Sequence, residues 1–207
     1  MSGLKIYGIS GSRAQRTLWM AEELKAELDF EYDHMPVHFV SESKTPEYLA
    51  INPNGRVPAM DDNGFILFES LAINLYLVKK NGASMLAPKN AEEEALAIQW
   101  SIWALTELED NIISLVVRHP AVAMYPPDEA IEGAARAGLE RPLKVLDAHL
   151  TGREYVIADR FTVADLGVSG VLSLTALIKY DLNSYPNVKE WFERCIARPA
   201  YAATRSL

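Results

Sequence analysis

A glutamate and a serine stand where a short apolar run passes into an apolar segment of helical length. The run is Phe65–Phe68, the pair is Glu69 and Ser70, and the following segment extends from Leu71 to Lys80. Serine is a favoured cap residue, so Ser70 fits this position without any ligand. Glu69 has no such explanation. The free N–H groups at a helix start suit a carboxylate, and Glu69 suits an ammonium, so the pair predicts a small ligand that carries both a carboxylate and an ammonium.

A proline lies in the preceding strand-like run, Val57–Met60. Pro58 has a fixed φ and cannot donate to a sheet ladder, so it indicates an edge or an end of a strand. A free edge leaves main-chain groups with which an extended ligand can pair. Alone, Pro58 reads as an ordinary edge proline, but its position ahead of the glutamate and serine favours a binding site.

Two more hydroxyl groups, Ser10 and Ser12, flank Gly11 in a turn after the apolar run Leu4 to Ile9. Each serine either caps the helix that follows or donates to an anion, and one residue can do both. A hydroxyl that donates to a charged group contributes roughly 1.5–3 kcal/mol. That energy corresponds to a shift of about one to two units in the pKa of the acceptor.

The elements that must position these groups fall into two parts. In residues 1–82 the patterns predict, in order, strand, helix, strand, an irregular or briefly helical stretch, a hairpin and a helix. Their ranges are 4–9, 13–28, 31–37, 41–52, 57–60 with 65–68, and 71–80. The order βαβ followed by ββα is that of a thioredoxin-like α/β domain, here written βαβββα.

Residues 83–90 carry Pro88 and no periodicity, so we place a linker there and a second domain at 91–207. The second domain is predicted to be all-helical, which makes the fold class α/β plus all-α. One long helix starts near residue 91, with an apolar face formed by Ala95, Ile98, Ile102, Leu105, Ile112 and Val116. Further helices are predicted at 131–150, kinked at Pro142, at 163–179 after a capping box of Thr162 and Asp165, and at 188–196.

Charge and composition exclude several classes of function. The 207 residues carry a formal net charge of −8 without a cluster of Lys and Arg, which argues against nucleic acid as a partner. The only cysteine, Cys195, lies on an apolar stripe and is expected to be buried, and four dispersed histidines predict no metal site. No apolar run approaches the ~20 residues of a membrane span. The amino-terminal residues show no signal pattern, so we expect a cytoplasmic protein.

The motif from Asn52 to Met60, followed by Phe65 to Ser70, resembles the glutathione-binding half of a glutathione transferase. The likeness extends over nearly the whole chain through Phe161–Asp165 and the ending from Tyr185 to Pro199. It implies a cytosolic, serine-type, bacterial-like enzyme of theta-like or phi-like kind. Such an enzyme uses glutathione as cosubstrate without a metal, acts in detoxification of small apolar electrophiles, and forms a homodimer.

The same resemblance implies roles for individual residues. The main chain of Val57, before a cis Pro58, pairs with the cysteinyl part of glutathione, and Glu69 with Ser70 holds its γ-glutamyl end. The residues that contact its glycyl carboxylate and backbone are Ser43, Lys44 and Arg56.

The hydroxyl that activates the thiol stays open at this point. Counted back from Arg16, Ser12 matches the serine of the theta-like and delta-like enzymes, whereas the phi spacing falls on Gly11, which has no side chain. We therefore rank Ser12 first, Ser10 second and Tyr7 third. The resemblance implies that the thiolate attacks an electrophile held against the helical domain.

Two kinds of alternative remain. The protein could instead use the bound thiolate as a peroxidase, a disulfide reductase, a dehalogenase or an isomerase. The missing side chain at Gly11 also leaves room for a non-catalytic protein of the same fold that binds or scaffolds. The segment Arg118 to Pro127, with Met124 and Tyr125, either lines the apolar pocket or simply connects two helices.

Overall fold

The computed structural model describes residues 3–207, which form two compact units. The N-terminal unit contains the described residues up to Pro88 together with Ala197–Leu207, and the helical unit is Lys89–Ile196. Residues 197–207 thus pack with the N-terminal unit, whereas the sequence analysis counted them with the helical domain. The fold class is confirmed: a thioredoxin-like α/β part is followed by an all-helical part.

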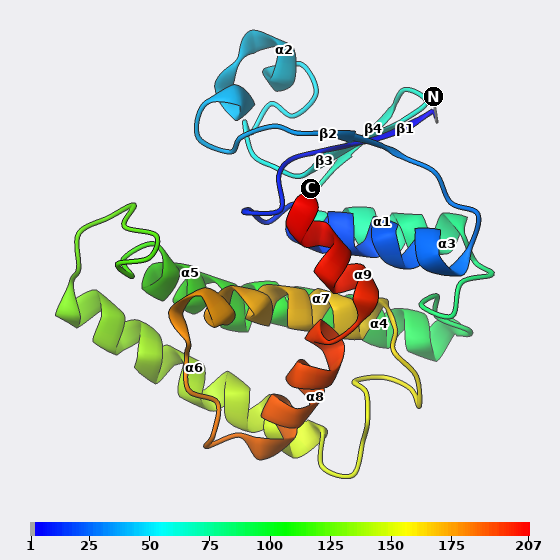
Figure 1. Ribbon diagram of the computed structural model, residues 1–207. Helices are drawn as coiled ribbons and strands as arrows, with labels where there is room; N and C mark the ends of the chain where they lie inside the picture. The colour runs from blue at the N-terminus through cyan, green and yellow to red at the C-terminus, as the bar shows by residue number, and fades with distance from the viewer. Residues whose placement is uncertain (1–2) are drawn as a thin grey trace. The chain divides into compact units, whose positions relative to one another are not determined.

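The N-terminal unit is built on a four-stranded sheet in the order β2-β1-β3-β4. Strand β1 (Leu4–Tyr7) is parallel to β2 (Asp33–Met35) and antiparallel to β3 (Ala59–Asp62), which is antiparallel to β4 (Phe65–Phe68). Helices α1 (Gln15–Glu27) and α3 (Ser70–Lys80) cover one face, and the short η1 (Glu42–Lys44) and α2 (Pro46–Leu49) lie on the other side (Figure 1).

Strand β1 ends at Tyr7 instead of Ile9, and β2 begins at Asp33 instead of Glu31. Prolines explain why β2 ends early and why β3 is shifted towards Asp62. Strand β2 stops at Met35 instead of Val37, because Pro36 has no N–H to donate to the ladder. Strand β3 starts at Ala59 instead of Val57, because Pro58 also lacks an N–H. Pro58 therefore stands just outside the sheet, at the point where the chain enters β3.

Apolar side chains from the sheet and its two helices form the core of this unit. Ile6 and Met60 from the sheet, Leu18, Trp19 and Leu24 from α1, and Ile73 and Leu77 from α3 are fully buried. Burying one such side chain stabilises the fold by about 1.5–3 kcal/mol. The core holds the strand ends and the helix starts in fixed register.

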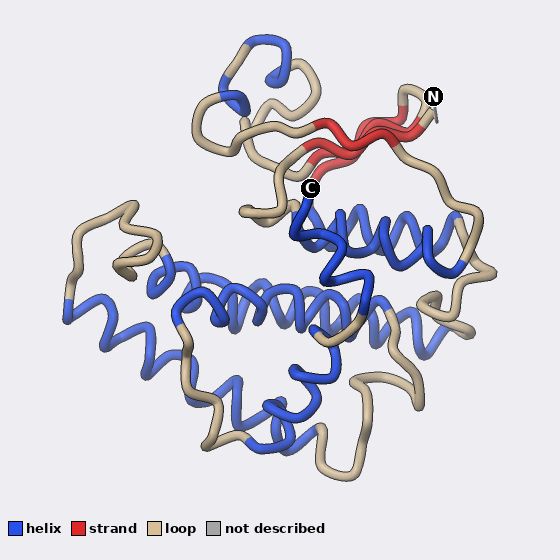
Figure 2. The backbone as a smooth tube through the Cα atoms, viewed as in Figure 1, coloured by secondary structure: helices blue, strands red, loops and turns tan. Residues whose placement is uncertain are grey.

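The helical unit begins with an unbroken helical run from residue 91 to 116, as predicted (Figure 2). It comprises α4 (Ala91–Trp103), a π-helical stretch η2 (Ala104–Glu109) and α5 (Asp110–Val116). The helices that follow are α6 (Glu129–His149), α7 (Val163–Leu172) with the 3₁₀ continuation η3 (Ser173–Ile178), and α8 (Pro186–Ile196). Within the described residues, no helix combines the length and the apolar character needed to cross a membrane.

The apolar face predicted for the first long helix is only partly buried. Ile112 and Val116 lie in the core, but Ile98 and Ile102 are exposed, and Trp100 with Leu108 takes the inward positions instead. The π-helical stretch explains the difference, because each of its turns holds one extra residue and so rotates the face that follows it. A single 3.6-residue period therefore does not describe the whole run.

The predicted capping box at the start of α7 is present. Asp165 Oδ2 accepts hydrogen bonds from the Thr162 N–H at 2.9 Å and the Thr162 hydroxyl at 2.8 Å. Its Oδ1 accepts from the Val156 N–H at 2.8 Å and from Trp191 Nε1 at 3.0 Å. The helix ends at Leu172 instead of Lys179, and the hydroxyls of Ser173 and Thr175 bond to carbonyls three residues back in the tighter turns.

The helical structure continues beyond Ile196, where the last predicted helix ends. Pro199 opens a further short helix, α9 (Pro199–Ala203), because the first helical turn needs no donor from a proline. A 3₁₀ turn, η4 (Thr204–Ser206), follows, and both pack against α1. Cys195 on α8 is fully buried, as expected.

Candidate functional site

Strand register gathers the predicted site residues at one end of the sheet. Tyr7, the last residue of β1, pairs with Met35 and with Ala59, and Ala59 pairs with Phe68. The chain therefore leaves β1, β2 and β4 and enters β3 at the same end. The loop with Ser10 and Ser12, the segment with Ser43 and Lys44, the Val57–Pro58 bond, and the Glu69–Ser70 pair all start from this row of residues.

The loop after β1, residues 8–14, packs closely on the chain before β3. Gly8 has φ +133°, and a Cβ there would lie 2.4 Å from the Ala14 Cβ and 3.1 Å from the Val57 Cβ. Only glycine fits this conformation and this spacing. The loop that carries both serines is thus held against Val57, the residue before the proline.

Both loop serines donate to main-chain carbonyls. The Ser12 hydroxyl donates to the Ile9 carbonyl at 2.7 Å and accepts from the Ala14 N–H at 3.1 Å. The Ser10 hydroxyl donates to the Leu207 carbonyl at 2.7 Å. Neither serine caps α1, which begins at Gln15 with Ala14 as its cap residue. The cap interpretation is therefore wrong for Ser10, whereas the Ser12 hydroxyl does accept an N–H of the turn that leads into α1.

Tyr7, the third candidate for the activating hydroxyl, is buried at the end of β1. Its ring meets the Tyr48 ring edge-on, with the two centroids 6.1 Å apart. Burial, followed by the nearby Asp61 carboxylate, raises the pKa of the Tyr7 phenol. Tyr7 therefore stays protonated at neutral pH.

The peptide bond between Val57 and Pro58 is cis, as the resemblance implied. Directly before it, the Arg56 carbonyl accepts from the Tyr48 hydroxyl at 2.8 Å and from Asn52 Nδ2 at 2.7 Å. Among residues 3–207, no hydrogen bond joins the main-chain N–H or C=O of Val57 to a partner. This rigidly held main chain can pair with an extended ligand.

Sequence reasoning missed Asn52 and Tyr48 as residues that shape this segment. Both are buried, and Asn52 Oδ1 also accepts from the Asn54 N–H at 3.1 Å. An asparagine that bonds two residues ahead is typical of an Asx turn, so the run Asn-Pro-Asn-Gly carried the signal. Gly55, at φ +58°, completes the turn.

The three residues assigned to the glycyl part of the ligand differ in exposure. Ser43 is fully buried, and its hydroxyl donates to the Phe39 carbonyl at 2.8 Å. Lys44 is exposed, and its ammonium donates to the Gly55 carbonyl. Arg56 is also exposed. Lys44 and Arg56 therefore present the cationic groups of this part of the site.

Glu69 and Ser70 lie at the start of α3, but Ser70 is not the cap. The helix begins at Ser70, and Glu69 is the residue before it, with φ 74° and ψ 112°. The interpretation of Ser70 as a cap is therefore wrong. A glutamate with positive φ costs of order 1–3 kcal/mol and persists where the surroundings enforce it, often at ligand sites. The Glu69 side chain is exposed and directed by this main-chain geometry.

A buried arginine connects the two helix starts. Arg16 on α1 is 2% exposed, and its Nη1 donates to the Ser70 hydroxyl at 3.4 Å. The Arg16 carbonyl accepts from Asn74 Nδ2 of α3 at 3.2 Å. The guanidinium adds positive charge to the free N–H groups of α3, which favours an anion there. The sequence analysis used Arg16 only to count positions; its helical spacing from Trp19 and Met20, which places it on an apolar face, was the available signal.

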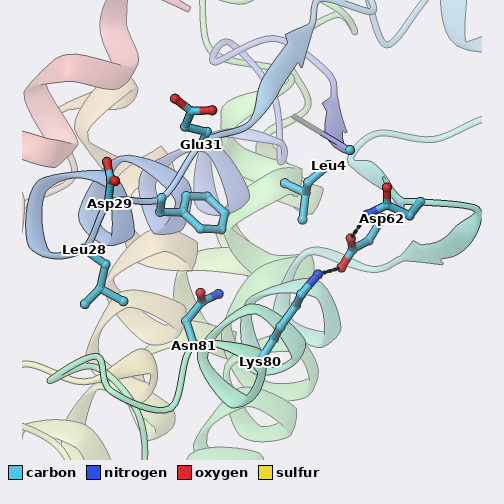
Figure 3. Close-up of a pocket in the computed structure, with 10 residues that line it drawn as sticks. Leu4, Leu28, Asp29, Glu31, Asp62, Lys80 and Asn81 are labelled. Atoms are coloured by element: carbon cyan, nitrogen blue, oxygen red, sulfur yellow. Dashed lines mark hydrogen bonds and ion pairs between the residues drawn. The ribbon is translucent and has the colours of Figure 1, made fainter. Parts of the chain in front are cut away.

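The opposite end of the sheet has a separate pocket of about 260 Å³ (Figure 3). It is lined in part by Leu4, Phe30, Asp62 and Lys80. Burial acts to raise the pKa of Asp62, but hydrogen bonds from Lys80, Tyr76 and Asn63 outweigh it, and the pKa is lowered. The Lys80 ammonium already compensates the Asp62 carboxylate, so this pair leaves no unmatched charge for a ligand. None of the predicted site residues lies here.

A thioredoxin-like unit with a cis-proline edge, followed by an all-helical unit, defines the class of protein. Family models for the N-terminal and the C-terminal domain of glutathione S-transferase match residues 2–79 and 107–199. The chain belongs to the glutathione S-transferase family.

Individual relatives agree with this assignment. The chain is 33% identical to a probable glutathione S-transferase, GSTF2, of Oryza sativa subsp. japonica, over 100% of this chain and 98% of that protein. Glutathione transferase F7 of Populus trichocarpa has a similar structure, with a TM-score of 0.85, 27% identity and 98% of each chain covered. A theta class glutathione S-transferase of Xanthomonas axonopodis pv. citri, solved with glutathione bound, gives a TM-score of 0.85 at 28% identity, with 99% and 97% covered.

These findings make the protein an enzyme, a glutathione S-transferase, and favour glutathione conjugation over the peroxidase, reductase, dehalogenase, isomerase and scaffold alternatives. Among the described residues, no group of three His, Cys, Asp or Glu side chains is arranged to hold a metal ion.

Proposed function

We propose that the sheet end formed by the loop 8–14, the Val57–Pro58 bond and the start of α3 binds glutathione. In this proposal Ser12 stabilises the glutathione thiolate, which then attacks a small apolar electrophile. The observation that carries the proposal is the strand register, because the pairs Tyr7 with Ala59 and Ala59 with Phe68 place all three segments side by side.

The charged head of glutathione fits the start of α3. Its γ-glutamyl carbon carries an ammonium and a carboxylate, and the helix start offers the Glu69 carboxylate for the first and free N–H groups for the second. The Ser70 hydroxyl, with the buried Arg16 guanidinium behind it, adds to the anion site. The cysteinyl part then pairs with the main chain of Val57, and the glycyl carboxylate meets Lys44 and Arg56, while Ser43 supports their segment from within.

Ser12 suits the role of thiolate donor because its oxygen already accepts the Ala14 N–H. Accepting one hydrogen bond polarises a hydroxyl and makes its own O–H a better donor. When that O–H turns to the sulfur, the Ile9 carbonyl keeps the Ser12 N–H as a donor, at 3.2 Å. The loop therefore loses little when the hydroxyl is recruited.

The reaction balances without a metal or a redox partner. The thiol proton leaves to solvent, the sulfur forms a bond to an electrophilic carbon, and a leaving group such as chloride departs with its electron pair. Glutathione-dependent release of chloride from a chlorinated nitroarene tests this step. We propose that the exposed Met124 and Tyr125 belong to the surface that receives the electrophile.

The binding proposal is tested by calorimetry with Glu69→Gln. Loss of a charged hydrogen bond is expected to weaken binding of reduced glutathione by about 10- to 150-fold. N-acetylated glutathione lacks the ammonium, so Glu69→Gln should leave its affinity almost unchanged. The control is Glu47→Gln, at another exposed glutamate on α2. Equal affinities of wild type and Glu69→Gln for reduced glutathione would reject the assigned orientation.

We further propose that the protein is a homodimer in the cytosol, where reduced glutathione is abundant. Helix α4 exposes Leu96, Ile98 and Ile102, which are 36%, 43% and 57% accessible. Such apolar residues on one helix are typical of a surface that a second copy covers. Light scattering tests this: wild type should have twice the mass of one chain, and Ile102→Glu should lower it. The control is Val145→Glu, which places the same charge at an exposed valine on α6.

A further inference from the structure

Ser10 connects the candidate catalytic loop to a distant part of the chain. Its hydroxyl donates to the Leu207 carbonyl at 2.7 Å, and its N–H donates to the same oxygen at 3.3 Å. The two residues are 197 positions apart in sequence. A serine has a single O–H to donate, so in this structure that donor is used to hold the loop.

The segment that presents Leu207 is itself anchored on α1, the helix that directly follows the loop. The Arg198 guanidinium forms two hydrogen bonds with the Glu23 carboxylate, at 2.6 and 2.7 Å. The Tyr201 ring packs edge-on against Trp19, with the ring centroids 4.8 Å apart. Figure 1 shows α9 crossing α1 and the C-terminal end of the described chain lying close to the sheet. Leu207 therefore offers its carbonyl from a fixed support.

We infer that Ser10 is a positioning residue for the transferase reaction and that residues 198–207 are the support through which it acts. The inference rests on the proposed function of Ser12. The loop packs against Val57 at Gly8 and is bonded to Leu207 at Ser10. These two contacts keep Ser12, two residues further on, in a constant place relative to Val57. Ser10 thus sets where the thiolate donor lies without touching the sulfur.

The two serines differ in which hydrogen bond is lost when the hydroxyl rotates away from its present acceptor. Ser12 bonds to Ile9, three residues away, and this contact belongs to a local turn. Ser10 bonds to Leu207, and releasing that contact detaches the loop from its support. The Ser12 hydroxyl is consequently the one that can be recruited by a ligand, and the Ser10 hydroxyl is the one that must stay.

The test compares Ser10→Ala, Ser12→Ala and a chain shortened to end at Ser206, with Ser206→Ala as the control. The Ser206 hydroxyl donates to the Ala203 carbonyl and does not reach the loop. Ser10→Ala should raise KM for glutathione by about 3- to 10-fold and should raise the pKa of the bound thiol by clearly less than Ser12→Ala does, because the Ser12 hydroxyl is still present but less well placed. Ser12→Ala should raise that pKa by about one to two units. Ser10→Thr, which keeps the hydroxyl, should restore KM.

Ser10→Ala and removal of Leu207 break the same contact, so their effects on KM should not add. Additive effects, or a thiol pKa in Ser10→Ala that rises as far as in Ser12→Ala, would overturn the inference. Hydrogen exchange of residues 8–14 without glutathione separates this result from a failure of the binding proposal. Exchange should be faster in Ser10→Ala than in wild type or Ser206→Ala, and unchanged exchange would overturn the positioning role even in a protein that binds no glutathione.

Discussion

We predict how the pH dependence of kcat/KM changes when the serine of the loop is moved by one residue. The change tests whether the thiol is activated only by a hydroxyl that the loop holds in place, or by any hydroxyl nearby. The perturbation is Ser12→Ala, alone and combined with Gly11→Ser. Gly11 is exposed, and a Cβ added there meets no atom within 4 Å, so the new serine fits without strain. It would, however, lack the Ala14 N–H that orients and polarises Ser12.

The size of the effect follows from the thiolate fraction. With a thiol pKa of about 8.5 without the serine and a lowering of roughly one to two units by Ser12, the thiolate fraction at about pH 6.5 rises from roughly 1% to roughly 9–50%. A less basic thiolate is also a weaker nucleophile, with a Brønsted coefficient of about 0.4–0.5. Ser12→Ala should therefore lower kcat/KM by about 3- to 8-fold at about pH 6.5.

The assay is kcat/KM with a chlorinated nitroarene across the pH range, together with ultraviolet difference absorbance of the bound thiolate. Above about pH 9 both thiols are largely ionised, so the deficit of Ser12→Ala should disappear and, by the same Brønsted coefficient, the variant should become about 2- to 8-fold faster than wild type. The double variant Gly11→Ser, Ser12→Ala should recover less than half of the pKa shift, because water competes for an unheld hydroxyl. Full recovery would refute the argument from the Ala14 and Ile9 contacts, and a constant deficit at every pH would refute thiolate stabilisation.

Two predictions concern stability. Asp165→Asn should lower the free energy of unfolding by about 1.5–3 kcal/mol, because an amide cannot accept all four hydrogen bonds of this buried carboxylate. Urea unfolding measures the loss, with Asp159→Asn at an exposed position as the control. Equal losses in both variants would contradict the prediction. The pKa of Asp62 is lowered in the folded protein, so its stabilisation is present above about pH 4 and is lost as pH falls through the folded pKa. Asp62→Asn should thus be less stable than wild type near neutral pH, the difference shrinking in acid; a constant difference would count against the assigned charge.

Sequence patterns predicted the elements well wherever the physical cause was local. The Thr162–Asp165 capping box and the turn at Asn63–Gly64 between the two hairpin strands act within a few residues, so the residue types alone indicate them. Pro36 and Pro58 also act locally, but the predicted strands ran across both prolines, and those strand ends were wrong. The face of the first long helix was predicted less well. Whether Ile98 or Trp100 faces inward depends on the π-helical stretch that follows, and no short-range pattern marked that stretch.

Residue types and spacing alone predicted a thioredoxin-like part, a helical part and a site for a small charged peptide at a proline edge, because edge prolines and helix starts are marked by neighbouring residues. The cis form of the Val57–Pro58 bond was implied only by the family resemblance. Only the tertiary structure decided which hydrogen-bond partner each of the serine hydroxyls has. The Ser10 partner lies at Leu207 and the Ser70 partner at Arg16, and contacts between residues so far apart exist only after the core has brought their elements together.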